Sequence, residues 1–572
     1  MAIETRLQGL LHNLDQGTLA VWLWRTAVAA VMTVVAMIFF VFKFNGFSVP
    51  EAMDQAQIGR QIATGQGFTT LYARPLAMHL GLARTGRLNL PLSETSQAPL
   101  GPMVNAAVLL AGRTNFKFGP EAYVSPADRV IVLGTLVFFA GSMVLTYILG
   151  CRLFDPRLSL LGVGIVIATD LVWRFAFSGL PQMVMLFFFT ASLLALVAGL
   201  DANASGRRAK AVVMTLLAAL SLGIVTLGNG LGLWIFAGFW LFAIVTIKPR
   251  LTIAIASIVA YSAPLLPWAW HNWIAMRNPF GLPYYELFRK PGTDSLAFLS
   301  DFEPFLHFDF SDVLVNTADN FMSQAAGLFS YLGGSVVAAA FFVALALHIF
   351  RSWRPAQFRW AVLFMWSGAA AGMSVFGVGA AVSVNQMHIL FYPVMVLYGL
   401  AVLLMLWTTV STNQPLLRTL FLVFLYIVTL VPLAGTLAAT APRVNWPPYL
   451  PPLITRLAEW VRPDEAIASD IPWATAWYGN RLSLLLPESI GQFEIIHSER
   501  ILGMPMVGIY LTPFSRDLAA YDDIINGRYR EWARFVLGEI RPEEISSWML
   551  RSAISLPVDN QCIFYADRPR WR

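Results

Sequence analysis

The stretch VWLWRTAVAAVMTVVAMIFFVFK, residues 21–43, decides the fold class of this chain. A helix needs about 20 predominantly apolar residues to cross a hydrocarbon core of about 30 Å. Ten further apolar runs lie near residues 129–151, 158–176, 181–200, 210–228, 231–248, 251–270, 325–350, 359–380, 387–408 and 417–438. The pattern therefore predicts a polytopic α-helical membrane protein with about eleven transmembrane helices.

The composition agrees with this prediction. Of the 572 residues, 57% are apolar and only 13% are charged, whereas a soluble domain is about 25% charged. Such a chain lacks the polar surface to cover itself in water, but lipid favours an apolar exterior. Residues 98–112 are also apolar but short. We expect them to form a helix lying in or near the membrane interface.

Basic residues are distributed unevenly between the loops. If the N-terminus is cytoplasmic, the loops on that side contain Arg152, Arg157, Arg207, Arg208, Lys210, Lys248, Arg250, Arg351, Arg354, Arg359 and Arg418. The opposite short loops, near 229–230 and 380–386, contain no Lys or Arg. Since cytoplasmic loops are enriched in Lys and Arg, we expect a bacterial inner-membrane protein with outer loops 44–128 and 271–324. This topology accounts for the net charge of +6 without a nucleic-acid partner.

The last part of the chain, residues 441–572, differs from the first 440 residues. It opens with a Pro-rich joint at 446–448, and a helix is expected near 453–461. Short apolar strands are expected at 465–469, 482–486, 506–512 and 561–565. Residues 1–440 are therefore predicted to form the transmembrane domain, and 441–572 a small periplasmic α/β domain. Its acidic and aromatic residues, Asp470, Trp473, Trp477 and Tyr478, are expected in its core rather than in a sugar site.

The longest outer loop begins with VPEAMDQAQIGRQIATGQGFTT, residues 49–70. Pro50 is typical of a helix start. Asp54, Gln57 and Arg60 recur at three-residue spacing and so lie on one side of the expected helix. A carboxylate and a guanidinium then face the same space at the outer mouth of the bundle. On spacing alone, an exposed ion pair on an interfacial helix is the simpler explanation, and a functional site is the alternative.

The order of segments resembles the GT-C class of membrane glycosyltransferases. This class includes the dolichyl-phosphate-mannose protein mannosyltransferases and the bacterial lipid A aminoarabinose transferases. In the first loop, an acidic residue opens a helix that a Gly-rich stop ends before Phe68. Further similar segments are 97–102, 147–155, 177–181, 266–268, 277–280 and 469–478. The resemblance covers most of the chain, and the order of the segments is its best evidence.

The resemblance implies that a sugar passes from a polyprenyl-phosphate donor to an acceptor hydroxyl at the outer membrane face, with inversion. The acceptor is a lipid, a glycan or a protein. The general base of the class is the acid of the first loop, a role that falls here on Asp54. A carboxylate within hydrogen-bond reach of a hydroxyl can accept its proton as the new bond forms. The leaving phosphate needs cationic stabilisation, for which the outer loops offer Arg60, Arg74, Arg277 and Lys290.

Two amides stand where members of the class often carry acids. Gln55 follows Asp54, and Gln182 opens the fourth predicted helix. A divalent cation prefers carboxylate oxygens, so these amides disfavour a metal site, although Glu51 or Glu94 is able to substitute for them. Two alternatives follow. Either transfer is metal-free with one base, or the chain is an inactive GT-C-like protein that binds lipid or scaffolds a membrane assembly.

Other polar residues near the outer helix ends are candidates for substrate binding. The complete set of candidates, besides the basic residues above, is Glu51, Gln57, Glu94, Gln182, His271, Asn272, Tyr284, Tyr285 and His388. His and Tyr residues at this level are equally explained as an interfacial belt. Asp170 and Arg174, four residues apart in one apolar run, are expected to form an intrahelical ion pair.

The sequence gives no sign of a cofactor. No Cys/His spacing suggests zinc, and no Gly-rich phosphate-binding motif follows the tail strands. A transporter is a third functional class. It predicts internal repeats and broken or charged helices at mid-membrane, and neither is clear in this sequence.

Overall fold

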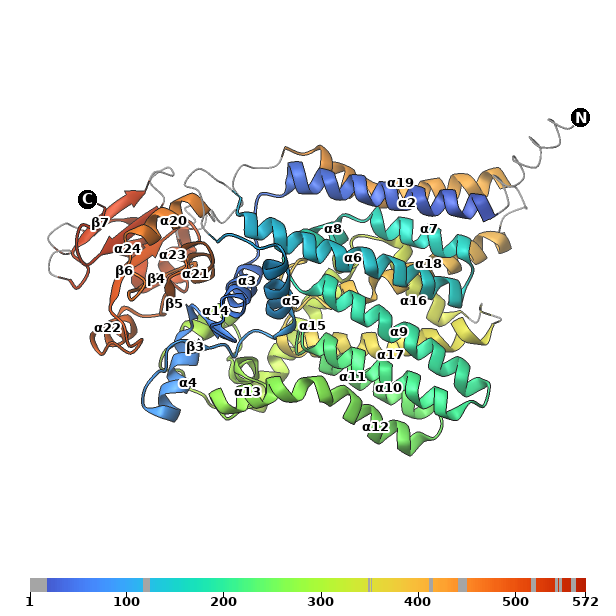
Figure 1. Cartoon of the computed structure of the whole chain (residues 1–572), viewed down its shortest axis with the longest axis horizontal. Helices are drawn as coiled ribbons and strands as arrows, with labels where there is room; N and C mark the ends of the chain where they lie inside the picture. Colours follow the sequence, from blue (N-terminus) through green and yellow to red (C-terminus); the bar gives the residue numbers. More distant parts are fainter. Residues whose placement is uncertain are drawn as a thin grey trace, which may run out of the picture.

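A computed structural model describes residues 18–116, 124–347, 350, 352–410, 415–440, 450–515, 521–540, 544, 548–556 and 562–571. Long helices run along the longest dimension of the molecule, and a small sheet lies at one end (Figure 1). The predicted Pro-rich joint at 446–448 lies outside the described residues.

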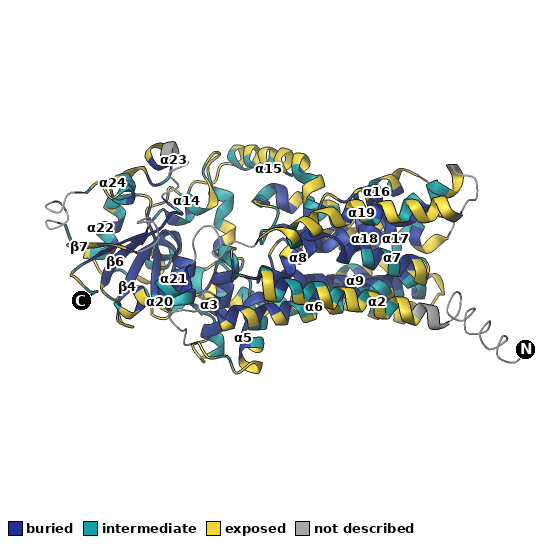
Figure 2. Cartoon of the chain, turned by 90° about the horizontal axis from the view of Figure 1, so that it is seen from above, coloured by how far each residue is buried: buried dark blue, intermediate teal, exposed yellow. Residues whose placement is uncertain are grey.

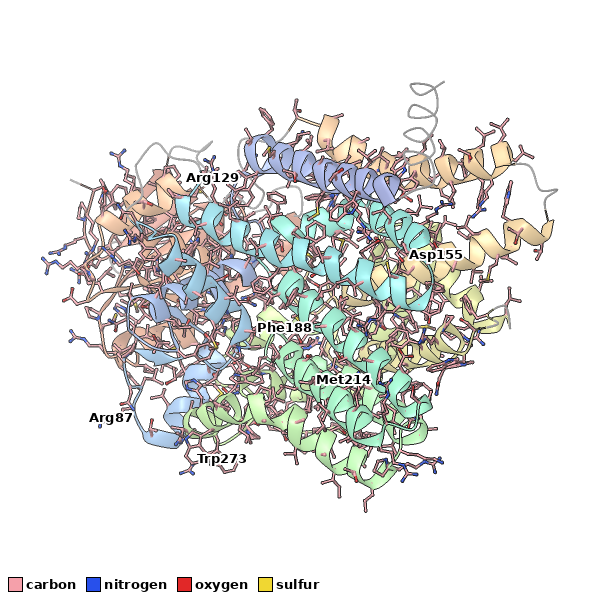
Figure 3. All side chains as sticks on the ribbon, turned by 45° about the vertical axis from the view of Figure 1, so that its right-hand side comes forward. Arg87, Arg129, Asp155, Phe188, Met214 and Trp273 are labelled. Carbon is pink, nitrogen blue, oxygen red and sulfur yellow. The ribbon has the colours of Figure 1, made fainter. Side chains whose placement is uncertain are left out.

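The helices of the bundle are mostly apolar along their whole length. They are α2 (Thr18–Ile38) with its π-helical extension η1 (Phe39–Lys43), α6 (Pro126–Leu153), α7 (Pro156–Ile167), α8 (Asp170–Phe177), α9 (Gln182–Ala204), α10 (Arg208–Thr226), α11 (Gly232–Thr246), α12 (Arg250–Ser262), η2 (Ala263–Leu265), α13 (Leu266–Met276), α15 (Phe310–Tyr331), α16 (Val336–Ala346), α17 (Trp353–Phe376), α18 (His388–Val410) and α19 (Pro415–Ala438). Figure 3 shows Arg129 and Asp155 near opposite ends of α6, with Arg129 on the side of the sheet.

By length and composition, seven helices among the described residues are able to cross a membrane, or nine if each of two bent pairs is one span. The predicted number of eleven spans is therefore not reached by this measure. Helix α11 has only 15 residues. Helix α17 has 24 residues, but Arg354 and Arg359 lie in its first two turns. The chain is nonetheless a multi-pass helical protein with a membrane-like apolar surface.

One predicted span is wrong. The sequence suggested a single helix over 325–350, but α15 and α16 meet at an angle of 116°. The break falls at Gly333 and Gly334, whose φ angles are +65° and +67°. Glycine adopts this left-handed backbone without the penalty that a Cβ brings, so the pair turns the chain sharply where apolar composition alone suggests continuity.

A second predicted span, 158–176, is also divided. Helices α7 and α8 are bent by 64° around Thr169, whose hydroxyl lies 2.6 Å from the Tyr392 hydroxyl. Asp170 opens α8, and Arg174 Nε lies 2.6 Å from Asp170 Oδ2. The predicted intrahelical ion pair is thus confirmed.

Exposed apolar side chains cover the outside of the bundle. Helices α2 and α19 lie side by side at one edge (Figure 1), and Lys43 at the end of η1 donates to the main-chain carbonyl of Ala439. Both helices show mostly exposed residues in Figure 2, among them Trp24, Met37 and Val431. Apolar surface of this extent is what a bilayer covers.

The loop segments between α2 and α6, and between α13 and α15, are largely structured. They contain α3 (Pro50–Ala63), β1 (Thr69–Thr70), β2 (Tyr72–Ala73), α4 (Pro75–Thr85), β3 (Leu92–Ser93), α5 (Leu100–Ala111), η3 (Leu282–Phe288) and α14 (Ser295–Ser300). Strands β1 and β3 pair antiparallel. Helix α5 corresponds to the short apolar run at 98–112 and packs against α3, with Gly59 so close that a Cβ there would lie 2.8 Å from Asn105 Cβ.

The tail folds into an α/β unit with a six-stranded sheet, in the order β2-β5-β4-β6-β8-β7. Its elements are α20 (Pro451–Glu459), β4 (Ala466–Ser469), α21 (Pro472–Gly479), β5 (Leu482–Leu485), α22 (Ile490–Ser498), β6 (Met506–Leu511), α23 (Tyr521–Asn526), η5 (Arg530–Trp532), α24 (Ala533–Leu537), β7 (Ser552–Leu556) and β8 (Cys562–Ala566). Strands β4, β5, β6 and β8 match the four predicted strands. The edge strand β2 comes from the first loop and pairs parallel with β5, which the sequence did not suggest.

Of the four acidic and aromatic residues expected in the core of the tail, Asp470 and Trp473 are buried there, whereas Trp477 and the half-buried Tyr478 lie at the contact with the bundle. Asp470, at the end of β4, accepts hydrogen bonds from the hydroxyls of Thr512 (3.0 Å) and Ser515 (2.7 Å). Trp477 and Tyr478 face the bundle, and each donates to a different oxygen of Asp128 at 2.8 Å. Asp128 lies in the first turn of α6, so these bonds fix α21 to the start of a long helix.

Candidate active site

Helix α3 forms the centre of the candidate site. Pro50 occupies its first turn, as predicted, and the chain turns away at Gly65 and Gly67, whose φ angles are +81° and +74°. All residues from 52 to 61 are buried, because α3 lies between α5 and α21 (Figure 1). The expectation of an exposed interfacial helix is therefore wrong.

Asp54 is only 2% exposed, and three side chains hold its carboxylate. Gln57 Nε2 donates to Oδ1 at 3.1 Å, and Gln97 Nε2 donates to Oδ2 at 2.7 Å. Arg74 Nη2 also donates to Oδ2. Gln57 is fixed in turn by Thr70 and by the main-chain N–H of Leu71. The carboxylate is thus held in one position by a network that reaches from α3 to β1.

Arg74 joins two carboxylates. It lies directly after β2, is 4% exposed, and pairs with Asp54 and with Glu94, at 3.3 Å from Nη1 to Oε2. Its guanidinium carbon lies 3.9 Å from the centre of the Tyr72 ring. Glu94 also accepts from the main-chain N–H groups of Ser96 and Gln97. Both carboxylates therefore share one buried cation.

Burial dominates the electrostatics of this network. It raises the pKa of Asp54 to about 6, against the opposing influence of Arg74 and of the Gln57 and Gln97 amides. Burial alone lowers the pKa of Arg74, but the Asp54 and Glu94 carboxylates hold that pKa above its usual value. Arg74 therefore stays cationic, and Asp54 is ionised at neutral pH but close enough to its pKa to exchange a proton.

A cavity of about 260 Å³ lies beside Arg74. It is bounded by α4, by the segment from Leu88 to Thr95 and by the end of α13, and Arg74, Arg84 and Arg87 are among its lining residues. No Asp or Glu is among the described residues that line it. Figure 3 shows Arg87 and Trp273 on the same side of the molecule, where α4 approaches α13. The cavity is thus suited to an anion that also carries an apolar part.

Helix α13 touches the site from the other side. His271 Nε2 lies 2.8 Å from the main-chain oxygen of Glu94, and the His271 ring meets Phe68 edge-on. Asn272 is buried and donates to the oxygen of Pro279. His271 thus supports the segment that carries Glu94, whereas Asn272 holds the loop that follows α13.

Arg60 does not belong to the Asp54 network. Its Nη1 and Nη2 donate to the main-chain oxygens of Trp477 and Ala476, both at 2.7 Å. It therefore anchors the end of α21, and the pairing with Asp54 that its spacing suggested is absent. Glu51 lies in the first turn of α3, where burial raises its pKa and the nearby Arg74 lowers it.

The remaining candidates lie elsewhere. Gln182 donates to the oxygens of Ser383 and Val384, in the loop between α17 and α18. His388 accepts from Trp366 at 3.0 Å and so joins α18 to α17. Tyr284 and Tyr285 pack against each other. The last two candidates, Arg277 and Lys290, are exposed.

The donor set offers little to a metal ion. No cluster of three or more His, Cys, Asp or Glu side chains suited to a metal occurs among the described residues. Arg74 occupies the place between the Asp54 and Glu94 carboxylates where a cation would sit. Gln55 donates to Gln97 at 3.2 Å, which places an amide next to the base.

Several residues of the site did not appear among the sequence candidates. Gln97, which contacts Asp54, belongs to the segment 97–102 that resembles the GT-C class, but no role was drawn from it. Arg84 and Arg87 lie near the end of α4, a helix that the sequence did not predict separately. A cluster of three arginines within 14 positions of an outer loop was the available signal.

Comparison with solved structures identifies the fold. The chain is similar to ArnT from Cupriavidus metallidurans bound to undecaprenyl phosphate, with a TM-score of 0.56 and 12% identity. The match covers 95% of this chain and 98% of ArnT. The archaeal oligosaccharyltransferase AglB from Archaeoglobus fulgidus, in complex with an inhibitory peptide and a dolichol-phosphate, covers 90% of this chain and 73% of its own, with a TM-score of 0.53 and 10% identity. No protein-family model and no curated protein sequence matches the chain.

Both neighbours are GT-C glycosyltransferases, so the chain has the GT-C fold that the order of its segments suggested. At identities of 10–12% the likeness shows the fold alone. Any activity must be argued from the site itself.

Proposed function

We propose that this protein transfers a sugar from a polyprenyl-phosphate donor to an acceptor hydroxyl, with inversion, at the outer face of a bacterial inner membrane. Asp54 is the general base. The observation that carries the proposal is a buried carboxylate with a pKa of about 6 whose partner Arg74 lines a cavity. The described residues that line this cavity include three arginines and no Asp or Glu. A general base works best when its pKa lies near the working pH.

The cavity supports the donor side of the reaction. Arg84 and Arg87 are exposed at the cavity, and guanidinium groups bind phosphate oxygens in a bidentate manner. As the bond from the anomeric carbon to the lipid phosphate breaks, negative charge grows on the leaving oxygen. Cations already in place stabilise that charge. Apolar lining residues such as Met78, Leu92 and Ile274 suit the start of a polyprenyl chain.

Arg74 connects the two halves of the proposed reaction. It lines the cavity and also holds Asp54 Oδ2. Asp54 Oδ2 already accepts from Gln97 and Arg74, so an acceptor hydroxyl that passes its proton to this oxygen must displace one of these donors. A phosphate in the cavity competes for Arg74, and this competition frees one oxygen of the base.

The hydrogen bonds to Asp54 also support the second candidate, an inactive protein that binds lipid or scaffolds a membrane assembly. Both Asp54 oxygens already accept hydrogen bonds, and Asp54 is not among the described residues that line the cavity. If Arg74 never leaves the carboxylate, the site binds a lipid phosphate without chemistry.

The test is transfer by the full chain in membranes supplied with polyprenyl-phosphate sugars. We expect Asp54→Asn to lower kcat by at least a hundredfold, because it removes the base, and to leave polyprenyl phosphate binding intact. Asp464→Asn, at an exposed position of the tail, is the matched control. Equal transfer by Asp54→Asn and wild type would remove Asp54 as the base. Polyprenyl phosphate binding without transfer from any donor would favour the scaffold.

A further inference from the structure

Two neighbouring residues with unpartnered polar atoms lie in the tail, in the turn between α23 and η5. Arg528 has two buried nitrogens, Nε and Nη2, that form no hydrogen bond, and the adjacent Tyr529 has a buried hydroxyl in the same condition. Tyr529 is 8% exposed, and its ring packs in the core of the tail. Among the described residues, Arg528 forms no ion pair, although Glu488 is close enough to feel its charge.

The turn is fixed at the carboxyl ends of the parallel strands. Trp532 Nε1 donates to the oxygen of Pro487 at 3.0 Å, and the Glu531 carboxylate accepts from the N–H of Ile490 at 3.0 Å. Both partners follow β5. Strand β2, the neighbour of β5, ends just before Arg74. Arg528 and Arg74 therefore both lie at the carboxyl ends of the parallel strands, near the ends of β5 and β2, respectively.

Tyr72 links this turn to the candidate active site. Burial raises its pKa, and the charges of Arg74, Asp54 and Arg528 all act on its hydroxyl. The Tyr72 ring, which lies under the Arg74 guanidinium, is thus also close enough to Arg528 to feel its charge. The charges of Asp470 and Asp294 also act on Tyr529, and the charge of Arg530 acts on Glu488.

An unpaired guanidinium in such a place is costly to the folded protein. Arg528 is half-buried, but two of its N–H groups lie buried without an acceptor, which costs free energy. The ring of Tyr529, 4.8 Å from the guanidinium carbon, compensates only in part. A bound ligand that accepts these hydrogen bonds removes the cost. The turn also lies on the sheet side of α3, away from the apolar helices that would hold a lipid donor (Figure 1).

We propose that Arg528 and Tyr529 form an oxyanion subsite for the acceptor, which therefore carries a phosphate or carboxylate group near the hydroxyl that is glycosylated. The subsite orients that hydroxyl toward Asp54 and forms no covalent bond. This assignment rests on the proposed function, but binding of the anion itself does not.

The first test measures stability without ligand. If Arg528 is held for a ligand, Arg528→Met leaves the Tm of the full chain in detergent unchanged or raises it, because it removes two buried nitrogens that lack an acceptor. The control is Arg60→Met, which removes a guanidinium whose two terminal nitrogens both donate to main-chain oxygens, and it lowers the Tm. A fall in Tm for Arg528→Met as large as that for Arg60→Met makes Arg528 a structural residue and overturns the proposal.

The second test measures anion binding in an Arg84→Gln/Arg87→Gln background, so that the cavity contributes little. Inorganic phosphate and acetate serve as probes at constant ionic strength. We expect Arg528→Gln to weaken binding of at least one probe about tenfold, whereas Arg530→Gln, the exposed neighbour, leaves it unchanged. Equal affinities of Arg528→Gln and its parent for both probes refute the subsite.

The third test separates acceptor from donor. With the cavity arginines intact, Arg528→Gln is expected to bind undecaprenyl phosphate as well as wild type does. Loss of that binding would assign Arg528 to the donor and overturn the acceptor subsite. If wild type transfers no sugar while the phosphate results hold, the proposed function fails and the anion site remains.

Discussion

Arg60 and Trp477 are joined by two kinds of contact: Arg60 Nη1 donates to the Trp477 main-chain oxygen at 2.7 Å, and the guanidinium carbon lies 5.2 Å from the Trp477 ring centre. The first residue lies on the helix that carries Asp54, and the second lies in the tail. Asp128 completes this interface by accepting from Trp477 and Tyr478. The candidate base is therefore mounted on a helix that the tail fixes in place.

Arg60→Met is expected to destabilise the protein by about 2–4 kcal/mol, because two main-chain oxygens lose a charged donor in a buried place. Arg60→Lys is expected to recover only part of this loss, since one ammonium cannot reproduce the two parallel N–H donors of a guanidinium. Denaturant or thermal unfolding of the full chain measures both. The exposed Arg530→Met serves as control. Unchanged stability with loss of undecaprenyl phosphate binding would instead return Arg60 to the donor site.

Gln55 donates to Gln97, and Gln97 donates to Asp54. A methyl group that displaces Gln55 is therefore expected to lower kcat. A Cβ at Gly101 would lie 2.0 Å from Gln55 Oε1, so Gly101→Ala displaces the Gln55 side chain and disturbs Gln97, which holds Asp54. We expect at least a tenfold fall in kcat with little change in Tm, because a flexible side chain can move aside. Gly435→Ala, in α19 with no heavy atom within 4 Å, is the matched control. Normal kcat in Gly101→Ala would show that the Gln55 position is irrelevant to the base.

The pKa of Asp54 predicts the pH dependence of transfer. Because burial raises it to about 6, the carboxylate needed for proton acceptance is lost as the pH falls through about 6. Below this pH, kcat/KM is expected to fall about tenfold per unit, and above it to reach a plateau. A pH profile between 4.5 and 8.5, with stability followed in parallel, checks this. A rate that is flat through pH 5 contradicts general-base catalysis by Asp54.

The cavity arginines predict selective weakening of donor binding. Arg84→Gln and Arg87→Gln should each weaken undecaprenyl phosphate binding about tenfold at low salt and less at high salt, since exposed charges are screened. Lys290→Gln is the control, because Lys290 is exposed and does not line the cavity. An equal effect of all three substitutions would indicate general attraction to the lipid headgroup rather than binding in the cavity.

Because Arg74 already occupies the place between Asp54 and Glu94 where a metal ion would sit, transfer is expected to continue in the presence of EDTA. The assay compares wild type before and after chelation, with added Mg²⁺ and Mn²⁺ as separate arms. Loss of transfer on chelation, restored by one of these ions, would show that a metal displaces Arg74 during the reaction.

The apolar runs and the helix signals around Asp54 predicted much of the bundle and the helix that carries the candidate base. Apolar composition fixes which segments enter lipid, and Pro50 with the glycines after α3 fixes that helix locally. The same reasoning failed at 325–350, because two apolar helices on either side of Gly333 and Gly334 have the composition of one span. It also assigned Arg60 to Asp54, because helical spacing shows which residues share a side but not what packs against that side.

The sequence by itself determined the multi-pass helical class, the four strands predicted in the tail and the helix that carries Asp54, since hydropathy and helix signals act over short distances. Only the tertiary structure decided that Arg74, and not Arg60, pairs with Asp54, that β2 joins the tail sheet, and that Arg528 lies at the carboxyl ends of the parallel strands. These relationships join residues 20 to several hundred positions apart, and long-range packing, which no local pattern encodes, brings them together.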